Sequence, residues 1–481
     1  MQTTLRGGGS RLTTKLYYGV GAAAYGIKDN GFSYFLLIYY NQVLGLPAAW
    51  VGAAIMATLI FDAISDPIVG YASDNLHSRW GRRHPFMYAS VIPVSVSFYF
   101  LWNPPELGPK ALLAYLLGMA VLVRTFITLY EIPSSSLVAE LTDDYDERTS
   151  MLSYRFFFGW WGGLTMAVVA LSVLLVETDE YENGMFNLEG WHSYGLLTAG
   201  AISTAILVSA IGTHRHIPYL KKPPEKQAFS ARRTARELKE TLSNRPFLVL
   251  FVSAIFGAMA AGVSTSLNFY FSTYFWELST QQMAILAIGP FASSAIALLA
   301  APMLSRRLGK KRGALLIFGL AALGAPLPIV GRLLDLMPAN GSPALVPTLL
   351  AFGVVEVGLI VTSSILISSM VADTVEDSEL RTGRRSEGVF FAARSFIMKC
   401  VHGIGVMTAT VLLTVIEFPV GAQPGMVDPG VTTRLGIIYA PSLLALNLIA
   451  LSFIAAYRIS RETHRRNLER LSESANQGTE G

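Results

Sequence analysis

The sequence predicts an all-α membrane protein with twelve transmembrane helices in two six-helix halves and both termini in the cytoplasm. Of its 481 residues, 52% are hydrophobic and 15% are charged, whereas soluble domains carry about 25% charged residues. Twelve apolar runs approach the roughly 20 helical residues that a bilayer requires. A short basic motif also recurs at equivalent points of the two halves. Together these observations exclude a soluble globular protein.

The predicted spans follow one another along the whole chain. They begin near Tyr17, Val51, Phe86, Ala111, Phe156, Ser193, Phe247, Met283, Gly313, Leu345, Gly388 and Leu435. A polar stretch rich in Lys and Arg separates the first six from the last six. The predicted domains are an N-terminal half at 1–213, a cytoplasmic central loop at 214–245, a C-terminal half at 246–457 and a cytoplasmic tail at 458–481.

Loop charge gives the expected orientation. Basic residues gather after the second and eighth spans, in the central loop and in the tail, whereas the loop at 177–190 carries five acids and neither Lys nor Arg. The positive-inside rule places the basic loops in the cytoplasm. The net charge of +4 arises from these loops and predicts no nucleic-acid partner. A single cysteine, Cys400, excludes a disulfide framework.

The basic motif forms an internal repeat. Arg79-Trp80-Gly81-Arg82-Arg83 follows the second span, and Arg307-Leu308-Gly309-Lys310-Lys311 follows the eighth. Coincidence of two positive-inside loops is the alternative, but the shared glycine and the half-chain spacing favour a true repeat. Repeated halves around a central site are a common plan of secondary transporters.

Acidic residues inside the apolar spans are the candidate functional residues. Asp62 and Asp66 lie four residues apart in the second span, and Thr128 and Glu131 lie three apart in the fourth, so each pair shares one helix face. Ionisable groups in a membrane interior are costly and usually functional. Carboxylate and hydroxyl oxygens suit a hard cation such as Na⁺. The same groups also suit H⁺ or Li⁺, and the sequence does not separate these ions.

Other charges in the spans have several alternative partners. Arg124, seven residues before Glu131, could neutralise Glu131 or Asp29, or clamp an anionic substrate. Lys28 precedes Asp29 in the first span, and Arg394 and Glu356 could pair across the second half. Structural roles compete with the functional ones. Examples are a kink cap at Asp66, which precedes Pro67, and a membrane anchor at Arg155.

Two motifs carry a resemblance to a known family. Residues 61–67 read Phe-Asp-Ala-Ile-Ser-Asp-Pro, and residues 78–82 read Ser-Arg-Trp-Gly-Arg. This pairing resembles the glycoside-pentoside-hexuronide:cation symporters of the major facilitator superfamily. Further matches are Gly70–Asp74, Arg155-Phe156-Phe157, Met370–Asp373 and Lys399. The resemblance extends over essentially the whole chain and implies the major facilitator fold.

The resemblance also implies roles for individual residues. Asp62, Asp66, Thr128 and Glu131 would form the cation site, with Lys399 on the eleventh helix beside it. Arg155 would lie on the gate or the substrate path, and Asp29 would accept sugar hydroxyls. The gating loops would contain Asp74, Arg82, Arg83, Arg306 and Lys310.

Cargo is the least determined property. Ser135 and Ser364 stand where sugar-carrying members have Trp, which argues against a simple galactoside. The first-helix spacing around Tyr25 and Phe35 fits the related lysophosphatidylcholine symporters equally well. We expect a cation-coupled symporter that moves a sugar or glycoside across the plasma membrane by alternating access. A lysophospholipid or other amphiphile is the alternative cargo.

The sequence predicts no enzyme. It contains no HExxH or GxSxG motif and no Cys/His cluster with metal-ligand spacing. We expect no cofactor other than the coupling ion, and a monomer surrounded by membrane lipid.

Overall fold

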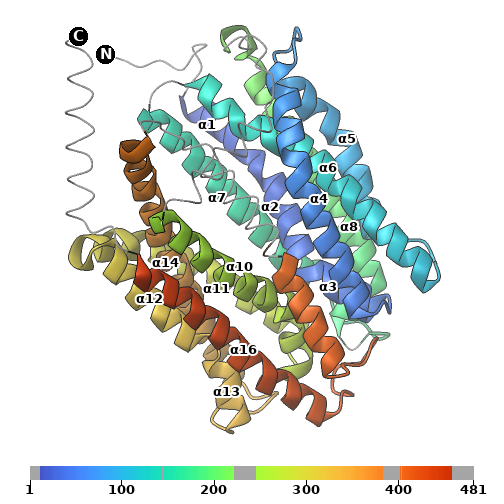
Figure 1. Cartoon of the computed structure of the whole chain (residues 1–481). Coiled ribbons are helices and arrows are strands. Elements are labelled where there is room, and N and C mark those ends of the chain that lie inside the picture. The colour runs from blue at the N-terminus through green and yellow to red at the C-terminus, as the bar shows by residue number, and fades with distance from the viewer. Residues whose placement is uncertain are drawn as a thin grey trace. The chain divides into compact units, whose positions relative to one another are not determined.

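A computed structural model describes residues 11–142, 145–181, 183–220, 245–382, 401 and 403–457 (Figure 1). All regular secondary structure in these residues is helical. The helices up to residue 220 are α1 (Arg11–Val20), α2 (Ala22–Asn30), η1 (Gly31–Phe35), α3 (Leu36–Ile38), η2 (Tyr39–Val43), α4 (Ala48–Asn75), α5 (His84–Leu101), α6 (Pro109–Leu141), α7 (Tyr145–Val169), η3 (Ala170–Leu174), η4 (Gly184–Phe186), α8 (Leu188–His214) and η5 (Ile217–Tyr219). Those after residue 244 are α10 (Arg245–Tyr270), η6 (Phe271–Phe275), α11 (Thr280–Leu308), α12 (Lys310–Gly324), α13 (Leu327–Leu333), α14 (Leu345–Thr382) and α16 (Pro429–Ala456), with a shorter apolar helix at Gly403–Val415.

Ten of the twelve predicted spans are confirmed as helices long and apolar enough to cross a membrane. The first span is helical too, but it is divided among α1, α2, η1, α3 and η2. Of the eleventh, Gly403–Val415 is described, and its predicted start near Gly388 lies outside the described residues. Most of the predicted central loop and the predicted tail also lie outside them.

Two π-helical turns divide the first span where aromatic side chains crowd together. The turns are η1 and η2, and the buried rings of Phe35 and Tyr39 lie against Trp191 at centroid distances of 5.6 and 4.8 Å. Trp191 in turn stacks on Trp102 at 5.3 Å. A π turn adds a residue to the helical turn and so changes which side chains face a neighbour. Here the π turns allow Phe35 and Tyr39, from one span, to contact the same Trp191 ring.

The described helices fall into two compact units, which differ from the predicted halves. The first unit lies within residues 1–229, 265–287 and 409–427, and the second within 230–264, 288–408 and 428–481. In the first unit a buried amide network joins pieces distant in sequence. Tyr274 donates to Gln42 Oε1 at 3.0 Å, and Gln42 Nε2 donates to the carbonyl of Pro419 at 3.2 Å. The boundaries predicted from the repeat remain a prediction.

Glycines allow α2 and α7 to pack closely in the first unit (Figure 1). A Cβ added at Gly26 would lie 1.8 Å from the carbonyl oxygen of Gly159, and one at Gly162 would lie 2.7 Å from Ala23 Cβ. Small residues let membrane helices approach at backbone contact. The helix that carries Lys28 and Asp29 is thereby held against the helix that carries Arg155.

In the second unit, α12 packs against α14 and α16. Phe247, Ala314 and Leu366 are among the residues of a buried apolar cluster there. Two side chains tie the helices across this cluster: Ser253 donates to the carbonyl of Ala450 at 2.9 Å, and Tyr457 to that of Met370 at 3.1 Å. Hydroxyl-to-carbonyl bonds of this kind satisfy polar groups where water is absent.

The glycine of the basic repeat has a positive φ angle in both copies. Gly81 lies just before α5 with φ 71°, and Gly309 lies between α11 and α12 with φ 77°. Positive φ is strained for a side chain with a Cβ, so both turns favour glycine. The conserved position of glycine within the repeat therefore has a structural reason in each half.

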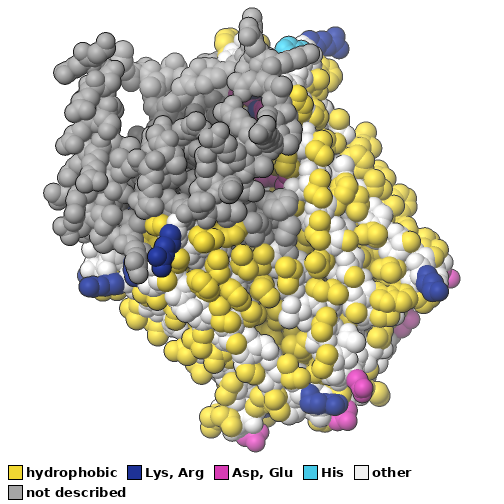
Figure 2. Space-filling model, in the orientation of Figure 1, with side chains coloured by type: hydrophobic (Ala, Val, Ile, Leu, Met, Phe, Trp, Pro, Cys, Tyr) yellow, Lys and Arg dark blue, Asp and Glu magenta, His cyan; other side chains and the backbone are white. Residues whose placement is uncertain are grey.

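The viewed surface is mostly hydrophobic (Figure 2). Large apolar side chains on the spans are widely exposed, including Ile92 at 73% and Leu299 at 74%. An apolar exterior on helices of this length matches the hydrocarbon core of a bilayer. The protein is an integral, multi-pass membrane protein.

Candidate functional site

The predicted acidic pair and Thr128 come together between α4 and α6. Asp62 and Asp66 occupy successive turns of α4, which packs against α6. Thr128 Oγ1 lies 3.0 Å from Asp62 Oδ1 and 3.1 Å from Asp66 Oδ1. Asp62 and Thr128 are buried, and Asp66 is half-buried. We call these three residues the carboxylate cluster.

The shared hydroxyl makes this cluster suited to a positive charge. A threonine hydroxyl has one proton, so it can donate to one carboxylate at a time. At any moment, the Thr128 oxygen therefore lies close to one of the two Asp oxygens with no hydrogen atom between them. A proton or a hard metal cation beside these oxygens would stabilise the arrangement.

Arg124 is a further member of the site, from the turn of α6 that precedes Thr128. Its Nη1 donates to Asp62 Oδ2 at 3.1 Å, and both side chains are 6% exposed. The guanidinium carbon lies 4.8 Å from the centre of the Phe32 ring. Arg124 Nε is buried without a hydrogen-bond partner among the described residues. The two oxygens of Asp62 are thus shared between a hydroxyl and a guanidinium.

Glu131 is engaged by Arg155 from α7. Arg155 Nη2 lies 2.7 Å from Glu131 Oε1, and Nη1 donates to Ser134 Oγ at 3.0 Å. The guanidinium also lies 5.5 Å from the centre of the Tyr18 ring. The structure therefore gives Arg155 a specific, half-buried ion-pair partner in α6, beyond the anchoring role considered from sequence.

Lys28 and Asp29 form a third charged pair, in α2. Lys28 Nζ lies 3.6 Å from Asp29 Oδ1 and 4.3 Å from the centre of the Tyr25 ring. The Lys28 side chain is 2% exposed, whereas that of Asp29 is 54% exposed. Within this pair, the Asp29 carboxylate is therefore the group that a solute could reach.

These contacts decide the pairings that the sequence left open. Arg124 contacts Asp62, and the two partners expected for it, Glu131 and Asp29, are instead paired with Arg155 and Lys28. Glu356 is half-buried within α14. Lys399 and Arg394 lie outside the described residues, so the predicted place of Lys399 beside the cation site and the Arg394–Glu356 pairing stay predictions.

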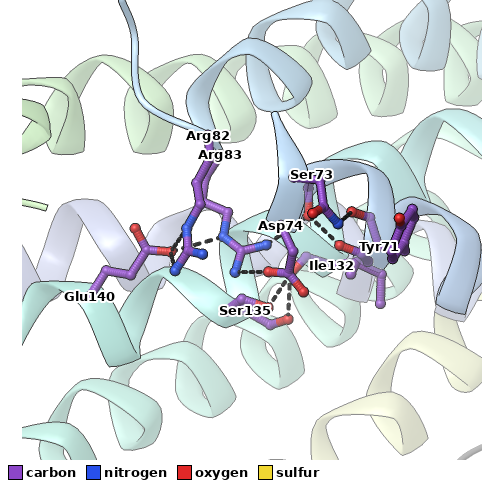
Figure 3. A network of polar contacts seen from close by, with 11 residues as sticks. Tyr71, Ser73, Asp74, Arg82, Arg83, Ile132, Ser135 and Glu140 are labelled. Carbon is purple, nitrogen blue, oxygen red and sulfur yellow. Dashed lines mark hydrogen bonds and ion pairs between the residues drawn. The ribbon is translucent and has the colours of Figure 1, made fainter. Parts of the chain in front are cut away.

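A second polar network lies where α4 ends and α5 begins (Figure 3). Glu140, near the end of α6, accepts at Oε1 from Arg82 Nε and Arg83 Nε, each at 2.9 Å. Arg83 also donates to Ser73 Oγ at 2.7 Å and forms an ion pair with Asp74. The predicted gating residues Asp74, Arg82 and Arg83 are thus brought together in one group, which we call the helix-end network.

Glu140 is the member of this network that the sequence analysis missed. Its side chain is 2% exposed although it lies at a helix end. The available signal was an acid at the end of an apolar span that is next to a basic loop. In the other half, Arg306 is exposed in the last turn of α11, and Lys310 is the first residue of α12.

The chain shares its fold with solved structures of transporters. The chain superposes on an inward-open form of the xylose transporter XylE from Escherichia coli with a TM-score of 0.65 and 14% identity, over 96% of this chain and 100% of that one. A D-xylose-proton symporter gives a TM-score of 0.63 at 15% identity, over 92% and 97% of the two chains. At this level of identity the likeness establishes the fold alone.

Residues 17–461 match the family described as MFS/sugar transport protein, and the chain belongs to that family. It is 26% identical to an uncharacterized symporter of Synechocystis over 94% of this chain and 95% of that protein. It is 27% identical to the isoprimeverose transporter of Lactiplantibacillus pentosus (78% and 74%) and to a glucuronide carrier protein homolog of Escherichia coli (77% and 76%). The resemblance predicted from the motifs is confirmed.

Proposed function

We propose that this protein is a cation-coupled symporter that moves a sugar or glycoside across the plasma membrane by alternating access. The observation that carries the coupling is the carboxylate cluster, in which Thr128 bridges Asp62 and Asp66 inside apolar helices. A coupling cation at this cluster would reduce the repulsion between the two acids. Binding of cation and solute would then favour each other by the same factor, as linkage requires.

The solute would occupy the region of the first unit where charged and aromatic groups meet. Asp29, with its exposed carboxylate, is suited to accept hydrogen bonds from sugar hydroxyls, and Tyr25 and Phe32 lie beside Lys28. Relatives of this chain include proteins named as an isoprimeverose transporter, a glucuronide carrier homolog and a putative glycoside/cation symporter. These names support a glycoside as cargo.

The helix-end network would act as a latch in the transport cycle. With the basic loops taken as cytoplasmic, Glu140 joins the end of α6 to the start of α5 through Arg82 and Arg83 on that side. The matching glycine turns at Gly81 and Gly309 support an equivalent role for Arg306 and Lys310 in the other half. Rocking of two repeated halves would break and reform such contacts.

Gradient-driven uptake into proteoliposomes tests this function. The full chain would be reconstituted, a Na⁺ gradient or a pH gradient imposed, and accumulation measured for radiolabelled glycosides, uronides and lysophosphatidylcholine. Accumulation of a glycoside above equilibrium, abolished by collapsing the gradient, is the expected result. Accumulation of lysophosphatidylcholine and of no glycoside would show that the cargo is an amphiphile and not a sugar. Equilibration without accumulation would refute coupling.

A further inference from the structure

Arg124 lies where a coupling cation would contact Asp62. Its Nη1 is 3.1 Å from Asp62 Oδ2, on the carboxylate whose other oxygen receives the Thr128 hydroxyl. Both side chains are 6% exposed, so water screens this pair weakly. A guanidinium cannot lose its charge in a protein. A permanent positive charge therefore lies in direct contact with the carboxylate cluster.

We infer that Arg124 is an ion-selecting residue, an internal counter-cation that prevents Na⁺ from binding at the carboxylate cluster. The inference rests on the proposed function and deepens it by distinguishing between the coupling ions. The same positive charge opposes Li⁺, so the proton remains as the driving cation.

Arg124 opposes Na⁺ binding in two ways, by its positive charge and by occupying an oxygen atom that the ion would use as a ligand. A hard metal ion bound at the cluster would use oxygens of Asp62, Asp66 and Thr128. One of the Asp62 oxygens is already a hydrogen-bond acceptor for Arg124. A like charge a few ångström from the bound ion would weaken its binding on the order of 100-fold, even at the effective dielectric of protein interiors.

The surroundings hold the guanidinium in this position. The Phe32 ring lies 4.8 Å from its carbon atom. Glu131, two turns further along much the same face of α6, is engaged separately by Arg155 at 2.7 Å. Lys28 Nζ lies 5.9 Å from the same Phe32 ring. Glu131 and Asp29, the two partners considered for Arg124 from sequence, thus have basic partners of their own.

The test is a Na⁺ titration of thermal stability on the purified full chain, with choline chloride keeping the ionic strength constant. The wild type is expected to melt at the same temperature in NaCl and in choline chloride. Arg124→Gln removes the charge and should be stabilised by Na⁺ in a saturable way, with a half-maximal concentration in the millimolar range. Arg124→Lys keeps the charge and should resemble the wild type. Thr128→Val added to Arg124→Gln should remove the Na⁺ response.

Two results would overturn the inference: a saturable Na⁺ stabilisation of the wild type, or no gain of Na⁺ response in folded Arg124→Gln. Recovery of Arg124→Gln solely in Na⁺-containing buffer would support it. If Arg124→Gln does not fold in either salt, the wild-type titration still tests the inference. A Na⁺ response of the wild type would show that the ion binds despite Arg124. Melting curves need no solute, so absence of glycoside uptake would refute the proposed function without affecting this result.

Discussion

The carboxylate cluster and the helix-end network use the same residue types in opposite ways. In the helix-end network one carboxylate oxygen of Glu140 accepts from two arginines, and Arg83 is shared with Ser73 and Asp74. In the carboxylate cluster one hydroxyl is shared by two acids, and one arginine contacts one of them. Two arginines balance two acids in the first arrangement, whereas two acids have one arginine beside them in the second. The first arrangement is therefore suited to hold helices together, whereas the second fits the cation site that we propose.

The largest effect is expected for Asp62→Asn, which removes a charge from the centre of the cluster. Coupled uptake should fall by about 100-fold, the upper range of measured coupling energies. The variant should also melt at lower temperature, because loss of one partner of a buried ion pair typically costs about 3–5 kcal/mol. Uptake driven by an imposed gradient and thermal unfolding would both be measured.

The double variant Asp62→Asn/Arg124→Gln is the matched control for that change. It removes both charges of the pair, so its melting temperature should recover most of the loss while coupled uptake stays low. Normal gradient-driven accumulation in either variant would remove Asp62 from the cation site.

Glu140→Gln should affect the helix-end network without changing ion binding. The buried Arg83 and the half-buried Arg82 would lose their shared carboxylate, at a cost of about 3 kcal/mol in unfolding free energy. Uptake should fall by roughly tenfold, the equivalent of about 1.4 kcal/mol in the balance between transport states. Its melting temperature should remain the same in NaCl and in choline chloride, as expected for the wild type. A response to Na⁺ in this variant would mean that the two regions are not separate.

Thr128→Val tests the shared hydroxyl with almost no change in side-chain volume. The loss of one hydrogen bond to a charged group, about 1.5–3 kcal/mol, should weaken the apparent affinity for the driving cation by roughly tenfold or more. Thr128→Ser keeps the hydroxyl and should stay close to the wild type. Equal behaviour of Val and Ser in the cation dependence of uptake would show that the hydroxyl does not contribute.

The smallest effect is expected for Asp74→Asn. The Asp74 side chain is 51% exposed, and exposed ion pairs contribute about 0–1 kcal/mol. Its melting temperature should therefore lie within a few degrees of the wild type, measured beside Glu140→Gln. If Asp74→Asn lowered the melting temperature as much as Glu140→Gln, Asp74 would stabilise the network as strongly as Glu140.

The sequence alone determined the helical membrane fold, because spans of apolar residues have few other solutions in a bilayer. It also predicted Asp62, Asp66, Thr128 and Glu131 as one group, from spacings of four and three residues within two helices and from the family motifs. The structure brings Asp62, Asp66 and Thr128 together but pairs Glu131 with Arg155. The glycine of the basic repeat was likewise evident in the sequence, and the left-handed backbone at Gly81 and Gly309 supplies its reason.

The tertiary structure alone decided which charges are paired. From sequence, Arg124 had Glu131 and Asp29 as candidate partners, and Glu140 had no assigned role. Helix packing places Arg124 against Asp62 and Arg155 against Glu131, and it buries Glu140 between two arginines. Spacing within one helix fixes which side chains share a face, but the rotation and depth of the neighbouring helix set the partner across the interface. Those quantities depend on close contacts such as Gly26 against Gly159, which arise from the packing of whole helices.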